Sequence, residues 1–109
     1  MLLKMQRMNI LLEKIEKFKN LVMNLGLPVE DIVLFGVLCP YCGKNDRIRP
    51  LEQPGNLKGE LEEVELTDYQ ELWIELLNSE VENNGLAVCK FCQNVTFINS
   101  DLSAVKPLY

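Results

Sequence analysis

All four cysteines of this chain occur in two Cys-x-x-Cys units, and their type and spacing are suited to binding a metal ion. The units read CPYC at 39–42 and CKFC at 89–92. Two residues between paired thiols let the backbone curl so that both sulfurs point at one ion. Two such units supply four soft, anionic sulfurs in a tetrahedral array, which suits zinc. The sequence therefore predicts one structural zinc ion per chain, bound by Cys39, Cys42, Cys89 and Cys92.

No other residues form a pattern that predicts catalysis. The chain has no histidine, so a serine–histidine pair is impossible, and the sequence marks no carboxylate or lysine as a general base. Four cysteines close the coordination shell of zinc, whereas catalytic zinc keeps an open position. We therefore predict a binding protein rather than an enzyme, with no small-molecule substrate.

The apolar pattern from Leu2 to Leu25 predicts an N-terminal helix. Steps of three and four keep one stripe on one helix face, and Gly26 suits the left-handed position that ends a helix. The stripe would either pack on the chain's own core or form the seam of a parallel homodimer. Both alternatives stay open, because the repeat is shorter than the ~3–4 heptads that would decide between them. The residues of the stripe are Met8, Leu11, Ile15, Phe18, Val22 and Leu25.

The segment between the cysteine pairs should contain strands, a turn and a second helix. Residues 32–38 are rich in β-branched and aromatic side chains, which favours a strand entering the first pair, and 46–52 follows as another strand. Proline and glycine at the centre of Gln53–Asn56 predict a type II turn. Thr67 and Gln70 form a capping-box pair that would begin a helix over 67–84.

The second cysteine pair should lie between two further strands. Residues 86–89 lead into the pair, and the alternation in 95–99 predicts the last strand. Trp73, on the apolar face of the inserted helix, is expected to be a core residue. We therefore predict an α+β fold, in which an N-terminal helix (1–27) precedes a zinc-binding domain (28–109) with an antiparallel sheet and the inserted helix.

The two cysteine units and their flanking strands resemble the zinc-ribbon group. CPYCGK followed by a strand, and CKFC between two strands, are similar to the paired knuckles of that group on an antiparallel sheet. The resemblance covers about 34–52 and 86–98. It implies metal ligation by the four cysteines but no single activity, because zinc ribbons serve in transcription, translation, nuclease accessory domains and protein docking. Gln93 departs from the pattern, since many second knuckles carry glycine there, and this predicts a different geometry for that turn.

Other uses of the cysteines must be weighed against zinc. Rubredoxins hold iron in the same two-knuckle arrangement, but they are shorter and usually have glycine after both pairs. CPYC after an apolar strand is similar to the glutaredoxin active site, where a helix N-terminus lowers the thiol pKa. Here Gly43, Asn45 and Pro50 leave no helical pattern after the motif. Disulfides are not expected inside a reducing cell. A thiol redox protein is thus the weakest functional alternative.

The charge of the chain bears on its partners. The formal charge is −5, and four thiolates with one zinc would make it about −7. Such a field disfavours nucleic acid over the surface as a whole. A local basic cluster could still contact phosphates, with nearby aromatic side chains for base stacking, or it could simply offset the charge of the zinc–thiolate centre. The cluster consists of Lys44, Arg47, Arg49 and Lys90.

We therefore predict a protein–protein interaction or assembly module that binds a protein partner or itself, with a nucleic-acid-binding regulator as the main alternative. The longest apolar run, residues 32–39, has eight residues, well below the ~18 that suggest a membrane span. The start of the chain mixes charges of both signs and does not resemble a secretory signal. A cytoplasmic location without membrane association is expected.

Overall fold

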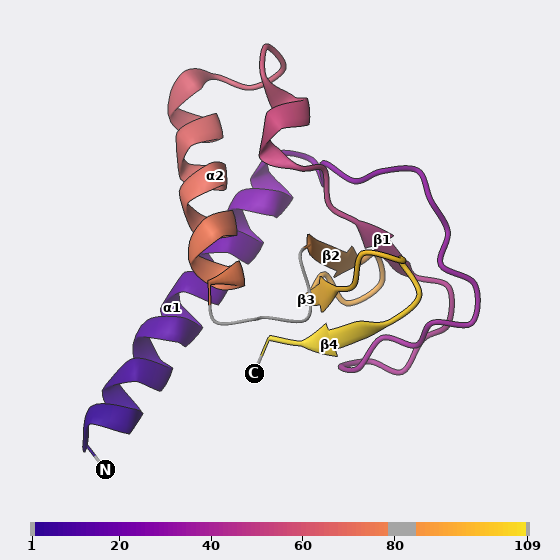
Figure 1. The fold of residues 1–109 in the computed structure, drawn as a ribbon, viewed down its shortest axis with the longest axis horizontal. Helices are drawn as coiled ribbons and strands as arrows, with labels where there is room; N and C mark the ends of the chain where they lie inside the picture. The colour runs from indigo at the N-terminus through magenta and orange to yellow at the C-terminus, as the bar shows by residue number, and fades with distance from the viewer. Residues whose placement is uncertain (1, 79–84, 109) are drawn as a thin grey trace.

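The structure, a computed structural model, describes residues 2–78 and 85–108, with side chains from residue 11 onward. Two helices and a four-stranded antiparallel sheet make up the predicted α+β fold. Figure 1 shows the helices side by side on one side of the molecule and the sheet on the other. The elements in chain order are α1 (Leu2–Asn24), β1 (Ile48–Pro50), the 3-10 helix η1 (Pro54–Leu57), α2 (Glu63–Leu77), β2 (Gly85–Cys89), β3 (Val95–Ile98) and β4 (Val105–Pro107).

The predicted N-terminal helix is confirmed as α1, and its end follows from Gly26. This glycine has a φ of +77°, which lets the chain leave the helix without the steric cost of a Cβ. Its N–H donates to the carbonyl of Met23, and the N–H of Leu27 donates to that of Val22. These two bonds form a Schellman motif and satisfy carbonyls that the helix end would leave unpaired. The chain then turns away towards the sheet.

The second helix begins earlier than the sequence predicts. α2 starts at Glu63, so Thr67 lies inside the helix, where its hydroxyl donates to the Glu63 carbonyl at 2.9 Å. The predicted capping box is therefore wrong. Carboxylates at Glu63 and Glu65 favour this start, because negative charge in the first turn complements the helix dipole. The predicted helix end over 79–84 lies outside the described residues.

The apolar face of α2 packs on α1 and the sheet. Trp73 is buried, as predicted, with its ring centroid 5.7 Å from that of Tyr69. Tyr69 in turn meets Phe18 of α1 at 5.4 Å. At the surface of the same contact, Lys14 pairs with Glu75 at 3.3 Å. α1 and α2 thus belong to one core.

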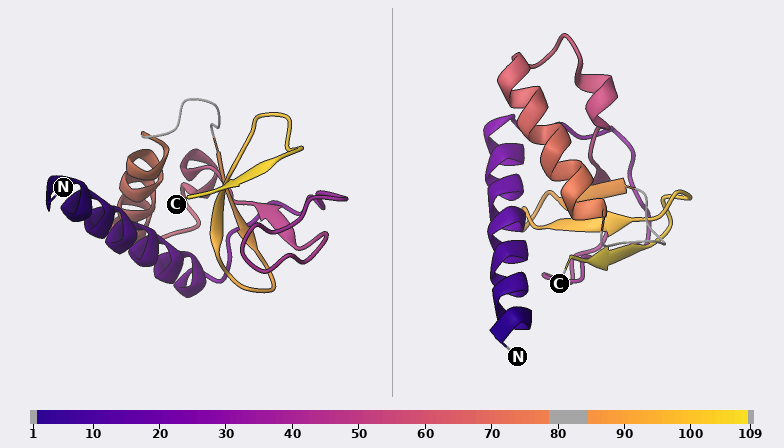
Figure 2. Two further views of the ribbon diagram at one scale, coloured as in Figure 1. Left: turned by 90° about the horizontal axis from the view of Figure 1, so that it is seen from below. Right: turned by 60° about the vertical axis from the view of Figure 1, so that its left-hand side comes forward.

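The strands run in the order β1-β2-β3-β4, and the two central strands are buried on both faces. Leu86, Val88, Val95 and Phe97 belong to the core shared with the helices. The intervening residues, including Ala87, Cys89 and Ile98, belong to a smaller core on the other face. The strands predicted over 86–89 and 95–99 are confirmed as β2 and β3, although β3 is not the last strand. Both are covered on both faces, so neither needs a polar side. Figure 2 shows the helix pair and the sheet as separate layers.

The edges of the sheet carry prolines, which cannot donate to a strand ladder. Pro50 is in β1 and Pro107 in β4, the two outer strands. The chain after α1 covers the β1 edge through one bridge between Val29 and Leu51. The N–H of Glu30 donates to the Pro50 carbonyl at 2.8 Å. The pairing of β1 with β2 confirms the predicted strand within 46–52, and the bond from Glu30 ties the first loop to it.

Two local predictions are wrong. Residues 32–38 form no strand, because Gly36 turns the chain at a φ of +79° and donates its N–H to the Asp46 carboxylate at 2.8 Å. Only an isolated bridge between Leu38 and Asn45 remains. The expected type II turn after Gln53 is instead the 3-10 helix η1. β4 is an element that the sequence analysis did not predict.

Among the described residues, no helix is long and apolar enough to cross a membrane.

Candidate metal centre

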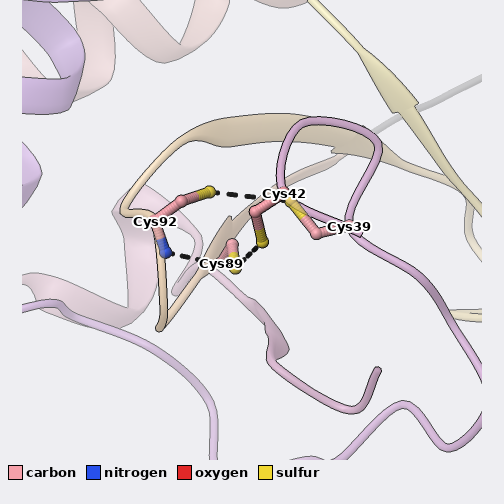
Figure 3. Close-up of side chains that lie close together, drawn as sticks. All are labelled: Cys39, Cys42, Cys89 and Cys92. Carbon is pink, nitrogen blue, oxygen red and sulfur yellow. Dashed lines mark hydrogen bonds between the residues drawn. The ribbon is translucent and has the colours of Figure 1, made fainter. Parts of the chain in front are cut away.

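The four cysteines come together from two loops at one face of the sheet (Figure 3). Cys39 and Cys42 belong to the loop before β1, Cys89 ends β2, and Cys92 lies in the turn between β2 and β3. All four Sγ atoms lie within 4.8 Å of one another. The sulfurs of Cys39 and Cys92 are 3.6 Å apart, and those of Cys42 and Cys89 are 3.7 Å apart. The register of β1 on β2, which pairs Ile48 with Cys89, brings the first loop to the second.

The two loops are built by the same hydrogen bonds. In the first, the N–H of Gly43 donates to the Cys39 carbonyl at 2.9 Å, and the N–H of Cys39 donates to the Lys44 carbonyl at 3.0 Å. In the second, Gln93 donates to the Cys89 carbonyl at 2.8 Å, and Cys89 donates to the Asn94 carbonyl at 3.0 Å. The paired bonds confirm that both Cys-x-x-Cys units are knuckles with one geometry.

Gln93 adopts the conformation that glycine takes in the first knuckle. Its φ is +60°, and that of Gly43 is +75°. The expectation that Gln93 changes the turn geometry is therefore wrong: the side chain is accommodated in the left-handed region, at a cost of ~1–2 kcal/mol for a residue with a Cβ. The hydrogen bonds of the knuckle impose this conformation.

The surroundings of the sulfurs change their pKa values when they are free thiols. Burial raises the pKa of Cys39, and it raises that of Cys89 to about 12. Burial acts in the same direction on Cys92, but hydrogen bonds from the Asn94 N–H, the Cys39 thiol and the Asn94 side chain outweigh it and lower the pKa. The Asn94 amide lies 3.4 Å from the Cys92 sulfur. Such donors also stabilise thiolates that bind a metal.

The donor set fits a tetrahedral thiolate-bound ion. A tetrahedron with metal–sulfur bonds of ~2.3 Å has sulfur–sulfur edges of about 3.8 Å, close to the Cys39–Cys92 and Cys42–Cys89 separations of 3.6 and 3.7 Å. Four cysteines would complete the coordination shell and leave no position for a substrate. All four are free, so none is held in a disulfide. Zinc and iron are both compatible with this arrangement.

The glutaredoxin-like alternative needs a helix after the CPYC motif. Residues 43–47 form a turn and loop, and β1 follows directly. No helix dipole therefore points at Cys39, and burial raises the pKa of its thiol. The electrostatic feature that activates a redox thiol is missing from this part of the chain.

The structure brings together three of the four predicted basic residues. Lys44, Arg47 and Lys90 are exposed on the two knuckle loops, and the Lys90 N–H donates to the Arg47 carbonyl at 2.8 Å. Lys44 holds its amine 4.9 Å from the ring centroid of Phe91. Arg49 is different, because its guanidinium donates to the backbone carbonyls of Asp46 and Ile48 at 2.8 and 3.0 Å.

The structure places most of the apolar stripe of the N-terminal helix in the chain's own core. Ile15, Phe18 and Val22 are buried against α2 and the sheet. Leu11 and Leu25 are partly buried at the edge of the same core. Met8 belongs to α1, but its side chain lies outside the described ones.

A link between the first knuckle and the segment after β4 was not predicted from the sequence. The Tyr41 hydroxyl accepts a hydrogen bond from the Leu108 N–H at 2.9 Å, just after β4. Val105 of β4 also packs against the metal-side core. Three residues in β4 are too few for a detectable period, so no sequence signal identifies this link.

Comparison with known protein families, curated proteins and solved structures finds no match to this chain.

Proposed function

We propose that this chain is a small zinc-binding protein whose metal is structural and whose role is protein–protein interaction or assembly. The supporting observation is the convergence of four free cysteine sulfurs from two knuckles of the same geometry. All-cysteine tetrahedral sites are typical of structural zinc. The ion would join two loops that are otherwise attached to the sheet through few buried residues.

The interaction role is supported by apolar side chains exposed beside the metal centre. Phe35 is 81% exposed, Leu38 is 56% exposed, and Phe91 at the tip of the second knuckle is 57% exposed. A small domain with a closed metal site would use the metal to hold such side chains in place. Large exposed apolar residues that gather on one part of a surface are typical of interaction sites.

Native mass spectrometry of the purified protein at neutral pH tests the zinc site directly. We expect a mass increment of one zinc per chain that is lost on chelation. Zinc should also protect the four thiols from alkylation, and chelation should remove this protection. Bound iron would instead be detected by its mass and visible absorbance. Metal-free protein that is still folded, with four titratable thiols, would overturn the zinc proposal.

A Cys42→Ser variant should retain zinc poorly, because three thiolates leave the shell open.

A nucleic-acid-binding regulator is the second candidate, because Lys44, Arg47 and Lys90 lie on adjoining loops beside the exposed Phe91 ring. Binding of this kind should weaken steeply as salt rises, since cations that contact phosphates release counterions. Arg47→Glu with Lys90→Glu should abolish it. Arg49→Gln should have less effect, because the Arg49 guanidinium is engaged with backbone carbonyls. Affinity that is independent of salt and unchanged by the double variant would exclude this candidate.

A further inference from the structure

The exposed residues of the two knuckle loops, together with Phe35 just before the first knuckle, form a surface that is both apolar and basic. We define this knuckle face by residues that are all exposed: Phe35, Leu38, Lys44, Arg47, Lys90 and Phe91. The bridge of Leu38 with Asn45 closes the first loop, and the bond from the Lys90 N–H to the Arg47 carbonyl joins the first loop to the second. In 35–47 and 90–94 the only carboxylate is Asp46, and it is engaged with the Gly36 N–H.

A surface of opposite charge lies on the outer side of α2 and the turn before it. Residues 59–78 contain seven carboxylates and no lysine or arginine. Val64 is 71% exposed among them. Residues 64, 68 and 71 follow the helical period and share one face. We define the acidic face by these exposed residues: Glu60, Glu62, Glu63, Val64, Asp68 and Glu71.

We propose that the knuckle face of one chain docks on the acidic face of a second copy. This inference rests on the proposed assembly role and names the partner. Both faces combine exposed apolar side chains with an excess of one charge, although Lys17 of α1 lies beside Asp68, so contact would bury the apolar groups and pair most of the charges. A second copy is the occupant that these charges favour, because the same chain carries both the basic and the acidic surface.

The positions of the two faces determine the kind of assembly. Figure 1 shows the start of α2 and the knuckle loops on opposite sides of the molecule, so one chain cannot satisfy both faces by itself. The contact joins different surfaces of the two copies and is therefore heterologous. Each added copy would again offer a free face. Association should proceed beyond dimers as concentration rises, unless the rotation between copies closes a ring.

Sedimentation velocity of the zinc-loaded full chain tests the contact. We expect self-association that weakens when salt rises from about 0.02 M to about 0.5 M, because exposed charge pairs are screened. Two double variants reverse the charge of one face each: Arg47→Glu with Lys90→Glu, and Asp68→Lys with Glu71→Lys. Each should weaken self-association by about tenfold or more. An equimolar mixture of the two should associate again, because each variant then offers a complementary face to the other.

Controls separate this test from effects on the metal and on the fold. Asp101→Lys changes an exposed carboxylate in the turn before β4 and should leave association unchanged. Phe35→Ser removes an apolar contact without touching a knuckle and should weaken association while zinc is retained. Zinc per chain is measured for every variant, so loss of metal is distinguishable from loss of contact.

Three outcomes would overturn the inference. The first is a zinc-loaded chain that stays monomeric up to about 1 mM, which would leave the zinc proposal intact. The second is association that neither charge reversal alters. The third is a monomer that binds a single-stranded oligonucleotide through Arg47 and Lys90, which would assign the knuckle face to nucleic acid.

Discussion

Gln93 shows at the scale of one residue how the knuckle hydrogen bonds override a local preference. Residues with a Cβ avoid a φ of +60°, because the side chain approaches the following carbonyl. The Gln93 N–H nevertheless donates to the Cys89 carbonyl at 2.8 Å, which requires the left-handed turn. Gly43 makes the equivalent bond without this strain.

Gln93→Gly is therefore expected to raise the free energy of unfolding of the zinc-loaded protein by about 0.5–1 kcal/mol. The substitution relieves the left-handed strain, and the greater backbone entropy of glycine in the unfolded chain offsets part of that gain. Urea unfolding at a fixed free zinc concentration measures the change. Gly43→Ala is the matched control and should destabilise by a similar amount, since it introduces a Cβ at a φ of +75°. A lower stability for Gln93→Gly would show that the side chain, which donates to the Lys90 carbonyl at 3.3 Å, contributes more than the strain costs.

The thiols of the metal-free protein should differ in reactivity. The thiolate is the reactive form, and Cys92 has a lowered pKa whereas burial raises that of Cys89 to about 12. Brief alkylation near neutral pH should therefore modify Cys92 before Cys39 or Cys89, as mapped by peptide mass spectrometry. Asn94→Ala should slow the reaction at Cys92, because it removes a hydrogen-bond donor. Zinc should protect all four cysteines, and equal reactivity in the folded, metal-free chain would contradict the prediction.

At the scale of elements, α1 illustrates why a periodic pattern identifies a helix but not its partner. Its stripe suits both a dimer seam and an internal face, since both bury one side of a helix. The structure provides an internal partner, because Phe18 is fully buried against Tyr69. A single periodic sequence contains no information on which surface covers the stripe.

Phe18→Ala should destabilise the chain by about 3–5 kcal/mol, because it leaves a cavity between α1 and α2. Leu12→Ala on the same helix is the control and should cost under about 1 kcal/mol, since Leu12 is 39% exposed and loses little buried area. Denaturant unfolding of dilute protein measures both variants. If Phe18→Ala destabilised the dilute protein as little as Leu12→Ala does, that result would contradict the internal packing of α1.

The elements that sequence predicted correctly are those whose signals are local. Gly26 ends α1 because one backbone angle is needed there, and the cysteine spacing specifies the knuckles before any fold is known. The strand expected over 32–38 failed, because its β-branched residues do not determine pairing. Gly36 donates instead to Asp46, ten residues away. Tyr41 and Leu108 meet across 67 residues of chain, and no local pattern encodes that contact.

At the scale of the whole molecule, the sheet separates two cores of unequal size. Among the residues whose side chains are described, the core on the helix side contains fourteen buried members, including Trp73. The core on the metal side contains six, and two of these are the candidate ligands Cys39 and Cys89. Burial of apolar area is the main source of stability, so the helix side should be the more stable part without metal. The part of the loop around Leu34 and Cys39 packs on the smaller core, and a bound ion would add to its attachment.

Chelation should therefore loosen the metal side before the helix side. We expect amide exchange in 34–47 to accelerate on zinc removal, while Trp73 fluorescence and the helical circular dichroism change little. Zinc binding free energies of ~10–16 kcal/mol in small peptides would act here mainly on the loops. The Phe18→Ala variant serves as the comparison, because it loosens the core on the helix side. In this variant the emission of Trp73 should shift to longer wavelength while the metal is still bound. If Trp73 becomes exposed in step with zinc loss, the two cores form one cooperative unit and the ion is required for the whole fold.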